Sequence, residues 1–376
     1  MNSKNLGILG VVAIAAIGGG IWLASERSSS NIDSATALYP DLKKTLNDAS
    51  AVRIHKAGDE LAVEIARKDE HWGVAQRQGY PADEAKVRKL LLAIANAEVR
   101  EEKTSTPKNY ASLGVEDVSD ANATGVRIEV VGIEPSISLI VGKQGTGLDS
   151  QYVRKAGEPQ SWLIDTSLDI SANPQDWLRK SIVDVTADRI QSATIETKGA
   201  RPYTAAKGSR ADANFAVESL PKGKELSSQT AANSVATALA GLTLSDVRPA
   251  SELTGKPEAR ATYRTFDGLT VEVDGWAMED DRFIALRARH DEELAERFRL
   301  PAAEAKDDAE KSEDRSSAGT TNEEDASNAA EQPAPSKRDT AEEASMLSSS
   351  LEGWAFEIPD YKYDALFKPL DGMLKK

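Results

Sequence analysis

The sequence predicts an α+β protein in which an N-terminal transmembrane helix is followed by two tandem repeats, each a mainly antiparallel sheet with one packed amphipathic helix. Three features of the 376-residue chain lead to this prediction. Short segments rich in β-branched residues are separated by Gly and Asp turns, a pattern typical of antiparallel strands. Apolar residues recur with helical spacing in two places. A segment near the C-terminus repeats a segment from the middle of the chain.

The N-terminus contains an uncharged run of nineteen residues, 6–24. At about 1.5 Å per residue, such a helix crosses a hydrocarbon core of about 30 Å. Lys4 precedes the run, which predicts a cytoplasmic N-terminus of residues 1–5, and Trp22 falls at the far interface. The alternative is a cleaved signal peptide, but the run is long for one and no clear cleavage site follows. We therefore expect a single-pass anchor in a bacterial inner membrane and a periplasmic main body.

A short stalk is expected at residues 25–50 and the first repeat at 51–182. The best-defined element of this repeat is an amphipathic helix over residues 83–100, which follows the start signals Pro81 and Asp83. Its apolar face is formed by Val87, Leu90, Leu91 and Ile94. Strand patterns precede the helix at 51–57, 61–67 and 71–76, and follow it at 125–132, 136–142, 150–157 and 161–167.

The second repeat is predicted at residues 183–300 and 350–376. Its helix has the same apolar spacing as the first, at Val235, Ala238, Leu239 and Leu242, and the tripeptide EVR of the first repeat returns as DVR. Its strand patterns lie at 192–198, 214–219, 261–268, 269–277 and 281–289. The segment WAFEIPDYKYDALFKPL, from Trp354, echoes WLIDTSLDISANPQDWLRK, from Trp162, and supplies the last strand and terminal helix. A tandem duplication with an interrupted second copy explains this echo.

The interruption is an acidic insert at residues 301–349. Between Ala302 and Ser345 the sequence has no Val, Ile, Leu, Met, Phe, Trp or Tyr, and its thirteen acidic and five basic residues give a net charge of −8. Such a segment has no large apolar side chains whose burial could offset an ordering cost of about 1–2 kcal/mol per residue. We therefore expect a disordered insert, preceded by a short helix within residues 290–300.

The overall composition limits the classes of function. The chain carries 61 acidic and 46 basic residues and a net charge of −15, which argues against sequence-independent nucleic-acid binding. It contains no cysteine, which excludes disulfides, thiolate metal sites and thiol nucleophiles.

Two loops resemble ligand-binding motifs without completing them. One contains Gly142, Gly145 and Gly147, but these glycines join two strand patterns instead of a strand and a helix, so a hairpin loop is predicted. The other runs from Asp120 and begins like an EF-hand, but Val131 stands where the bidentate glutamate is required, so a polar turn is predicted.

No residue pattern points to catalysis. The three histidines, His55, His71 and His290, show no zinc-ligand spacing, and no Gly-x-Ser-x-Gly nucleophile elbow is present. We predict no catalytic, cofactor-binding or metal-binding residues, no cofactor and no enzyme activity. The larger aromatic residues fall mostly at positions shared by the two repeats, which favours core packing over ligand stacking: Trp72, Tyr152, Trp162, Trp177, Trp276 and Trp354.

Several motifs of the first repeat resemble the family known as domain of unknown function 4340. They are HWGV at 71–74, YPADEAKVRKLLLAIANAEV at 80–99, YASLGV at 110–115, LIVG at 139–142, YVRKAG at 152–157 and PQDWL at 174–178. The second repeat matches more loosely, and the acidic insert departs from the family pattern. The resemblance implies a single-pass extracytoplasmic protein, commonly encoded beside an ABC transporter whose membrane subunit carries a gliding-motility-type domain. It supplies no catalytic residues.

The expected function is that of a non-enzymatic, membrane-anchored periplasmic accessory subunit of an ABC-type, gliding-motility-like transport complex, with permease and ATPase subunits as partners. One predicted span cannot form a translocation path, and the chain has no nucleotide-binding signature, so transport would require those partners. The alternative is a periplasmic binding module for cell-envelope polysaccharide or lipid. The sequence leaves the cargo, the partner surface, the role of the acidic insert and the oligomeric state open.

Overall fold

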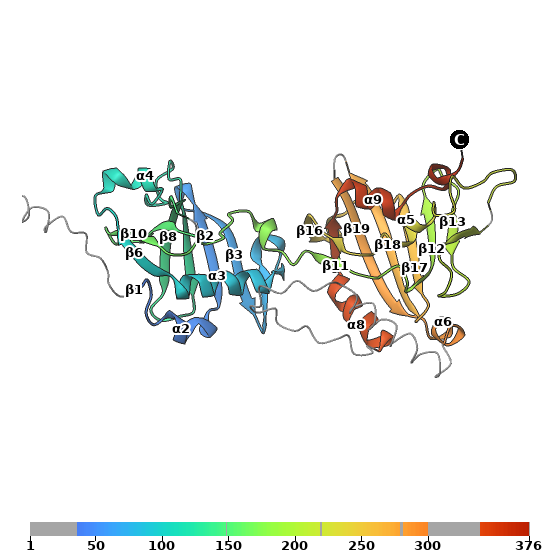
Figure 1. Ribbon diagram of the computed structural model, residues 1–376, viewed down its shortest axis with the longest axis horizontal. Helices are drawn as coiled ribbons and strands as arrows, with labels where there is room; N and C mark the ends of the chain where they lie inside the picture. The colour runs from blue at the N-terminus through green and yellow to red at the C-terminus, as the bar shows by residue number, and fades with distance from the viewer. Residues whose placement is uncertain (1–35, 148, 219, 279–280, 300–338, 376) are drawn as a thin grey trace, which may run out of the picture. The chain divides into compact units, whose positions relative to one another are not determined.

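The computed structural model describes residues 36–147, 149–218, 220–278, 281–299 and 339–375. The predicted transmembrane helix at 6–24 and most of the predicted acidic insert lie outside these ranges. Within the described ranges, no helix is long and apolar enough to span a membrane. The chain is mixed α+β, with antiparallel sheets and few helices, and it divides into two compact units between Leu178 and Arg179 (Figure 1).

The first unit is built on a ten-stranded antiparallel sheet in the order β1-β6-β10-β9-β8-β7-β2-β3-β4-β5. Its strands are β1 (Thr36–Ala37), β2 (Ala51–Lys56), β3 (Glu60–Lys68), β4 (His71–Val74), β5 (Tyr80–Pro81), β6 (Glu98–Glu102), β7 (Val126–Val131), β8 (Ile137–Gln144), β9 (Gln151–Lys155) and β10 (Ser161–Ile164). Val52 lies opposite Ile65 on one side and Val130 on the other, and all three are buried. Alternation along the strands therefore places one row of side chains in the core.

Residues 36–50 belong to this unit, so the stalk predicted at 25–50 is too long. Strand β1 pairs with β6, and the short helix α2 (Leu42–Thr45) follows it. Leu38, Leu42 and Ala49 are buried. These apolar side chains pack the segment against the sheet, which a solvated stalk would not require.

The predicted amphipathic helix of the first unit is confirmed as α3 (Glu84–Asn96). The Asp83 carboxylate caps it by accepting a hydrogen bond from the Lys86 backbone N–H, and the predicted apolar face is buried. The helix ends earlier than predicted, because residues 98–100 form strand β6. A second short helix, α4 (Tyr110–Leu113), lies between β6 and β7.

The second unit is built on an eight-stranded antiparallel sheet in the order β14-β13-β12-β17-β18-β19-β20-β16. Its strands are β12 (Ile190–Thr197), β13 (Tyr203–Ala206), β14 (Ala216–Glu218), β16 (Asp246–Pro249), β17 (Ala259–Thr265), β18 (Leu269–Met278), β19 (Asp281–His290) and β20 (Trp354–Glu357). A separate two-stranded pair joins β11 (Ser181–Val183) to β15 (Leu242–Thr243). The helices are α5 (Asn233–Ala236), α6 (Glu292–Arg297), α8 (Thr340–Leu351) and α9 (Asp360–Leu366).

Eight strands follow one another in the same spatial order in both units. The order β6-β10-β9-β8-β7-β2-β3-β4 of the first sheet corresponds strand by strand to β16-β20-β19-β18-β17-β12-β13-β14 of the second. The two echoing segments occupy equivalent places, since β10 lies between β6 and β9 and β20 lies between β16 and β19. The EVR and DVR tripeptides begin β6 and β16, so they mark equivalent strands instead of helix ends.

The second predicted amphipathic helix is wrong in length. The apolar positions are buried as expected, but α5 spans only four residues and Leu242 belongs to strand β15. Asn233, Ser234 and Thr237 are weaker helix formers than the Leu, Lys and Glu residues of α3. Gly241, with a φ of 54°, turns the chain into β15.

The predicted insert at 301–349 is also too long, because α8 begins at Thr340. The Asp339 carboxylate accepts a hydrogen bond from the Ala341 backbone N–H and starts the helix. Ala344 and Leu351 are buried where α8 packs against β18 and β19. The helix therefore gains stability from tertiary packing, which a reading of local composition cannot include.

The C-terminal segment is fastened to the second sheet through its backbone carbonyls. The hydroxyl of Tyr263 donates to the carbonyl of Leu366, that of Thr197 to Phe367, and that of Tyr203 to Lys368. The last carbonyls of a helix have no partner within the helix, so these three hydroxyls satisfy the last carbonyl of α9 and the two that follow it. Burial raises the pKa of both tyrosine phenols, which keeps them protonated as donors.

Gly275 of β18 lets α9 approach the sheet closely. A Cβ atom at this position would lie 2.5 Å from Phe367 Cε2 and 2.9 Å from the Tyr363 hydroxyl. The Tyr363 and Phe367 rings contact each other at an interplanar angle of 59°, with centroids 4.7 Å apart. The lack of a side chain at Gly275 therefore determines how closely α9 packs against the sheet.

We expect Gly275→Ala to loosen the C-terminal segment by roughly 1–3 kcal/mol, because the added methyl overpacks the ring contact. Gly372→Ala is the matched control, since a Cβ there meets no atom closer than 3.9 Å. Hydrogen–deuterium exchange of residues 360–370 is expected to accelerate in the first variant and stay unchanged in the second. Equal exchange in the two variants would contradict this packing.

Candidate functional site

The loops that resembled ligand-binding motifs have structural roles. Gly142 lies in β8, and the chain turns directly into the antiparallel partner β9, as the predicted hairpin requires. A Cβ atom on Gly142 would lie 2.3 Å from the Leu113 carbonyl oxygen, so this glycine allows a loop to pass over the strand. The Asp120 carboxylate accepts a hydrogen bond of 2.9 Å from the Asn122 backbone N–H and forms a polar turn.

Two of the histidines pair with carboxylates near strand ends. His55 Nε2 lies 3.5 Å from a Glu129 oxygen, and His71 Nδ1 lies 3.4 Å from a Glu84 oxygen. Among the described residues, no three His, Asp or Glu side chains converge in a way that would hold a metal ion.

The prediction that the tryptophans are core residues holds fully only for Trp177. Its side chain is completely buried, and its indole N–H donates to the Ser171 carbonyl at 2.8 Å. Trp72, Trp162, Trp276 and Trp354 are only half-buried. Equivalent positions in two units therefore indicate equivalent places in the sheet, but not complete burial.

Arg154 organises one face of the first sheet. Its guanidinium donates to the carbonyls of Val115 and Glu158 at 2.8 and 2.9 Å and to the Asp117 carboxylate at 2.7 Å. It also lies 4.5 Å from the centre of the Tyr110 ring. The side chain is 3% exposed, so these partners offset the cost of burying a cation.

This arginine joins two sequence motifs that lie far apart in the chain. Tyr110 and Val115 belong to YASLGV, and Arg154 belongs to YVRKAG. The Tyr110 hydroxyl donates to the Pro159 carbonyl at 2.6 Å, and its ring packs with Val115 and Ile140. The two motifs therefore act as one fastening that holds the α4 loop over β8 and β9.

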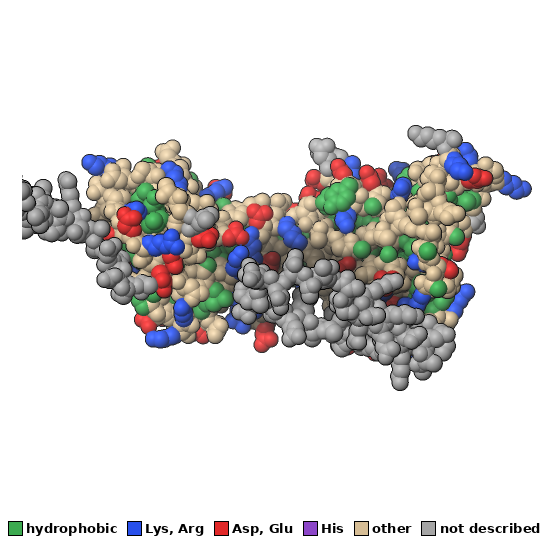
Figure 2. Space-filling model, in the orientation of Figure 1, with side chains coloured by type: hydrophobic (Ala, Val, Ile, Leu, Met, Phe, Trp, Pro, Cys, Tyr) green, Lys and Arg blue, Asp and Glu red, His purple; other side chains and the backbone are tan. Residues whose placement is uncertain are grey.

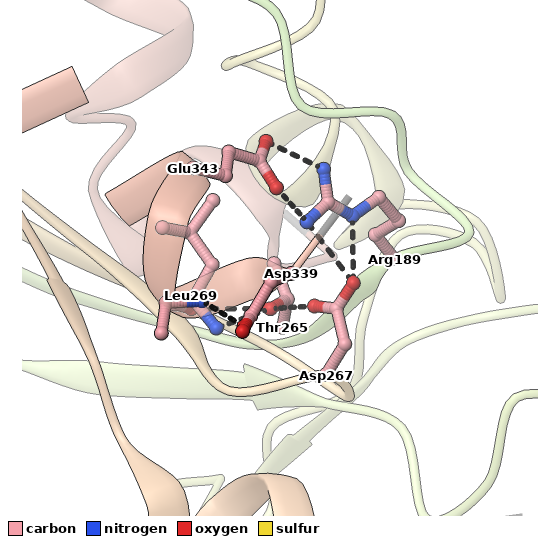
Figure 3. Close-up of polar contacts among 7 residues, drawn as sticks. Arg189, Thr265, Asp267, Leu269, Asp339 and Glu343 are labelled. Carbon is pink, nitrogen blue, oxygen red and sulfur yellow. Dashed lines mark hydrogen bonds and ion pairs between the residues drawn. The ribbon is translucent and has the colours of Figure 1, made fainter. Parts of the chain in front are cut away.

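A different arginine fastening in the second unit holds α8 (Figure 3). Arg189 donates to both oxygens of Glu343, at 2.9 and 2.8 Å, and to Asp267 at 3.0 Å. Thr265 donates to Asp267 and accepts from the Leu269 backbone N–H at 2.8 Å, which fixes the turn between β17 and β18. The hydrogen bond with Glu343 is the main cause that raises the pKa of Arg189. Sequence reasoning missed this pair because Glu343 lies in the segment predicted to be disordered.

The polar face of the second sheet carries a further ion-pair group. The Asp274 carboxylate is 7% exposed and accepts from Arg260 at 2.6 Å and from Arg287 at 2.8 Å. Its two oxygens are thus each matched by one guanidinium.

One hollow of the second unit is a groove beside α9, which we call the α9 groove. It has a volume of about 620 Å³ and lies between α9 and the ends of β12 and β17. The charged and tyrosine side chains that line it are Lys198, Glu258, Tyr361, Tyr363, Asp364 and Lys368. Figure 2 shows hydrophobic side chains at the surface near α9 with charged side chains around them.

The side chains of the α9 groove differ in how they are held. Glu258 Oε1 accepts from the Ala277 backbone N–H at 2.9 Å and from the Tyr363 hydroxyl at 3.4 Å. Burial first, and the neighbouring Glu258 carboxylate second, raise the pKa of Tyr363. Within the described chain, Lys198 and Lys368 form no ion pair, and Tyr361 is 68% exposed. The groove therefore combines a fixed acceptor, two available donors and an exposed aromatic ring.

Comparison with known proteins identifies one relationship. The model of a family described as domain of unknown function (DUF4340) matches residues 72–264, about half of the chain. The match runs from β4 in the first unit to β17 in the second. No curated protein and no solved structure matches the chain.

We expect Arg154→Ala to destabilise the first unit by about 3 kcal/mol, because buried carbonyls and the Tyr110 ring lose their cationic partner. Arg53→Ala is the control, since Arg53 is 41% exposed in its ion pair with Glu64 and such pairs contribute about 1 kcal/mol or less. Urea unfolding measures both changes. Similar losses in the two variants would show that Arg154 is not a fastening.

We expect Glu343→Gln to weaken the attachment of α8, because it replaces a charged bidentate partner of Arg189 by a neutral one. Hydrogen exchange in residues 340–351 should accelerate about tenfold, corresponding to about 1.4 kcal/mol. Glu342→Gln alters the neighbouring exposed carboxylate and is expected to leave exchange unchanged. If both variants exchange alike, the ion pair does not hold the helix.

Proposed function

The chain belongs to the domain of unknown function 4340 family, as its motifs indicated, and from this membership we propose that it is a non-enzymatic, membrane-anchored periplasmic accessory subunit of an ABC-type, gliding-motility-like transport complex. Its partners in this proposal are the permease and ATPase subunits. The uncharged run at 6–24 is the proposed anchor, with the N-terminus in the cytoplasm and both units in the periplasm.

The observation that carries this proposal is the strand order common to the two units. A tandem duplication is the simplest origin of two eight-strand sheets with one order. Duplication places two related binding surfaces on one tether, and a partner that contacts both is held more strongly than either contact alone would hold it. Such an arrangement suits a protein that organises other subunits.

The use of the charged side chains also supports a binding role. Arg154, Arg189 and Asp274 each hold a loop, a helix or neighbouring strands. These charged groups therefore already have hydrogen-bond partners within the protein. The same groups give each unit a firm surface, which lowers the ordering cost of binding a partner.

Contacts through faces and loops are favoured over strand addition at the sheet edges. The edge strands β1 and β5 of the first sheet are two residues long, and β14 and β16 of the second are three and four residues long. Short edge strands offer few free backbone groups for pairing.

A second candidate function is a periplasmic binding module for cell-envelope polysaccharide or lipid. The α9 groove is the observation that favours it, because ligand sites use an exposed aromatic ring beside lysines such as these, which have no ion-pair partner among the described residues.

The decisive experiment is purification of the tagged full-length chain from its native cell in mild detergent, followed by mass spectrometry. We expect ABC ATPase and permease subunits to accompany it in a constant ratio. The control is an unrelated single-pass periplasmic protein with the same tag and expression level. Recovery of the chain without transporter subunits, or equal recovery of these subunits with the control, would overturn the accessory-subunit proposal.

A further inference from the structure

We propose that the α9 groove binds an uncharged oligosaccharide, with Tyr361 as the stacking platform. The inference rests on the second candidate function, for which it names a site and a ligand class. It does not require association with a transporter.

The shape of the groove suits a chain-like ligand. A second hollow of about 930 Å³ adjoins it and shares Thr197, Lys198, Glu258 and Ala259 with it. The shared residues place the two hollows next to each other, at the end of β12 and the start of β17. Two adjoining open hollows offer room for several linked rings, whereas a compact small molecule is usually enclosed on most sides.

Tyr361 provides the apolar surface for such a ligand. Its side chain is 68% exposed although it lies on a well-packed helix. Two positions along, Tyr363 is anchored against Gly275 and Phe367, so α9 presents the Tyr361 ring from a fixed base. Tyrosine offers a large amphipathic contact area at little cost in conformational entropy, and the C–H face of a sugar ring is an apolar counterpart to it.

The polar groups match sugar hydroxyls, which both donate and accept hydrogen bonds. Glu258 is held through Oε1, and its Oε2 atom has no hydrogen bond within the described residues, so it can accept from a hydroxyl. The ammonium groups of Lys198 and Lys368 can donate to hydroxyl oxygens. Glu258 and Asp364 also line the groove and balance the two lysines. This balance favours an uncharged saccharide over a polyanion.

An extended peptide fits the groove less well. Peptides that bind to sheets usually pair with a free strand edge. Strand β12 already pairs with β13 and β17, and β17 pairs with β12 and β18. The groove therefore offers side chains but no unpaired strand backbone.

Isothermal titration calorimetry of the purified full-length chain tests the inference with cellotetraose and chitotetraose as uncharged probes. Tetragalacturonate serves as the anionic probe and tetra-alanine as the peptide probe. We expect at least one uncharged tetrasaccharide to bind with a Kd at or below about 1 mM, and the other two probes to bind more weakly.

Variants of the exposed aromatic residue locate the binding. Tyr361→Ala is expected to weaken binding about tenfold, whereas Tyr361→Phe retains most of the affinity because it keeps the ring. Met346→Ala is the matched control, since Met346 is 51% exposed in the same unit and does not line the groove. The far-ultraviolet circular dichroism of each variant confirms that the fold is kept.

Three results would overturn the inference: no binding of either uncharged tetrasaccharide, unchanged binding by Tyr361→Ala, or tighter binding of the peptide or anionic probe. Because the titration uses the purified chain alone, these results bear on the groove and not on co-purification with transporter subunits. The two proposals can therefore fail separately.

Discussion

Each sheet depends on a strand that arrives late in the sequence and enters between two earlier strands. Among the described strands of the second unit, β16 joins the eight-stranded sheet only through its pairing with β20, and β20 follows β19 by more than sixty residues of chain. Pairing at such a distance must overcome loop-closure entropy before it stabilises the fold. In the first unit the corresponding strand, β10, follows β9 after a short turn. The long segment that interrupts the second unit therefore lies between β19 and β20, and the pairing of the edge strand β16 depends on this connection.

The contacts around β20 compensate for this long connection. Helix α8 leads into β20 and is held by Arg189 through Glu343, while α9 leads away from β20 and is held by three hydroxyls and by the space above Gly275. The first fastening pairs a half-buried guanidinium with a carboxylate, and the second satisfies carbonyls at and just after the end of a helix. The strand is thus secured on both sides, and the same packing of α9 creates the groove.

The two units use one architecture with different surfaces. Helix α4 and the loop after it cover part of one face of the first sheet and are held by Arg154. The polar face of the second sheet instead carries the ion pairs of Asp274. Two sheets with one strand order but different loops and polar faces can offer two different contact surfaces, which is the property that the proposed accessory role requires.

The sequence by itself determined the α+β class, the antiparallel strands, helix α3 and the equivalence of the segments around Trp162 and Trp354, because these depend on local periodicity and turn residues. Its motifs also led to the family. Only the tertiary structure decided that α5 is a single turn, that residues 340–349 are helical and that residues 36–50 belong to the first unit. It alone brought Lys198, Glu258 and Tyr361 to one groove. The reason is physical: the stability of these segments comes from packing and ion pairs with residues distant in the chain. The composition of a segment does not show which distant residues it contacts.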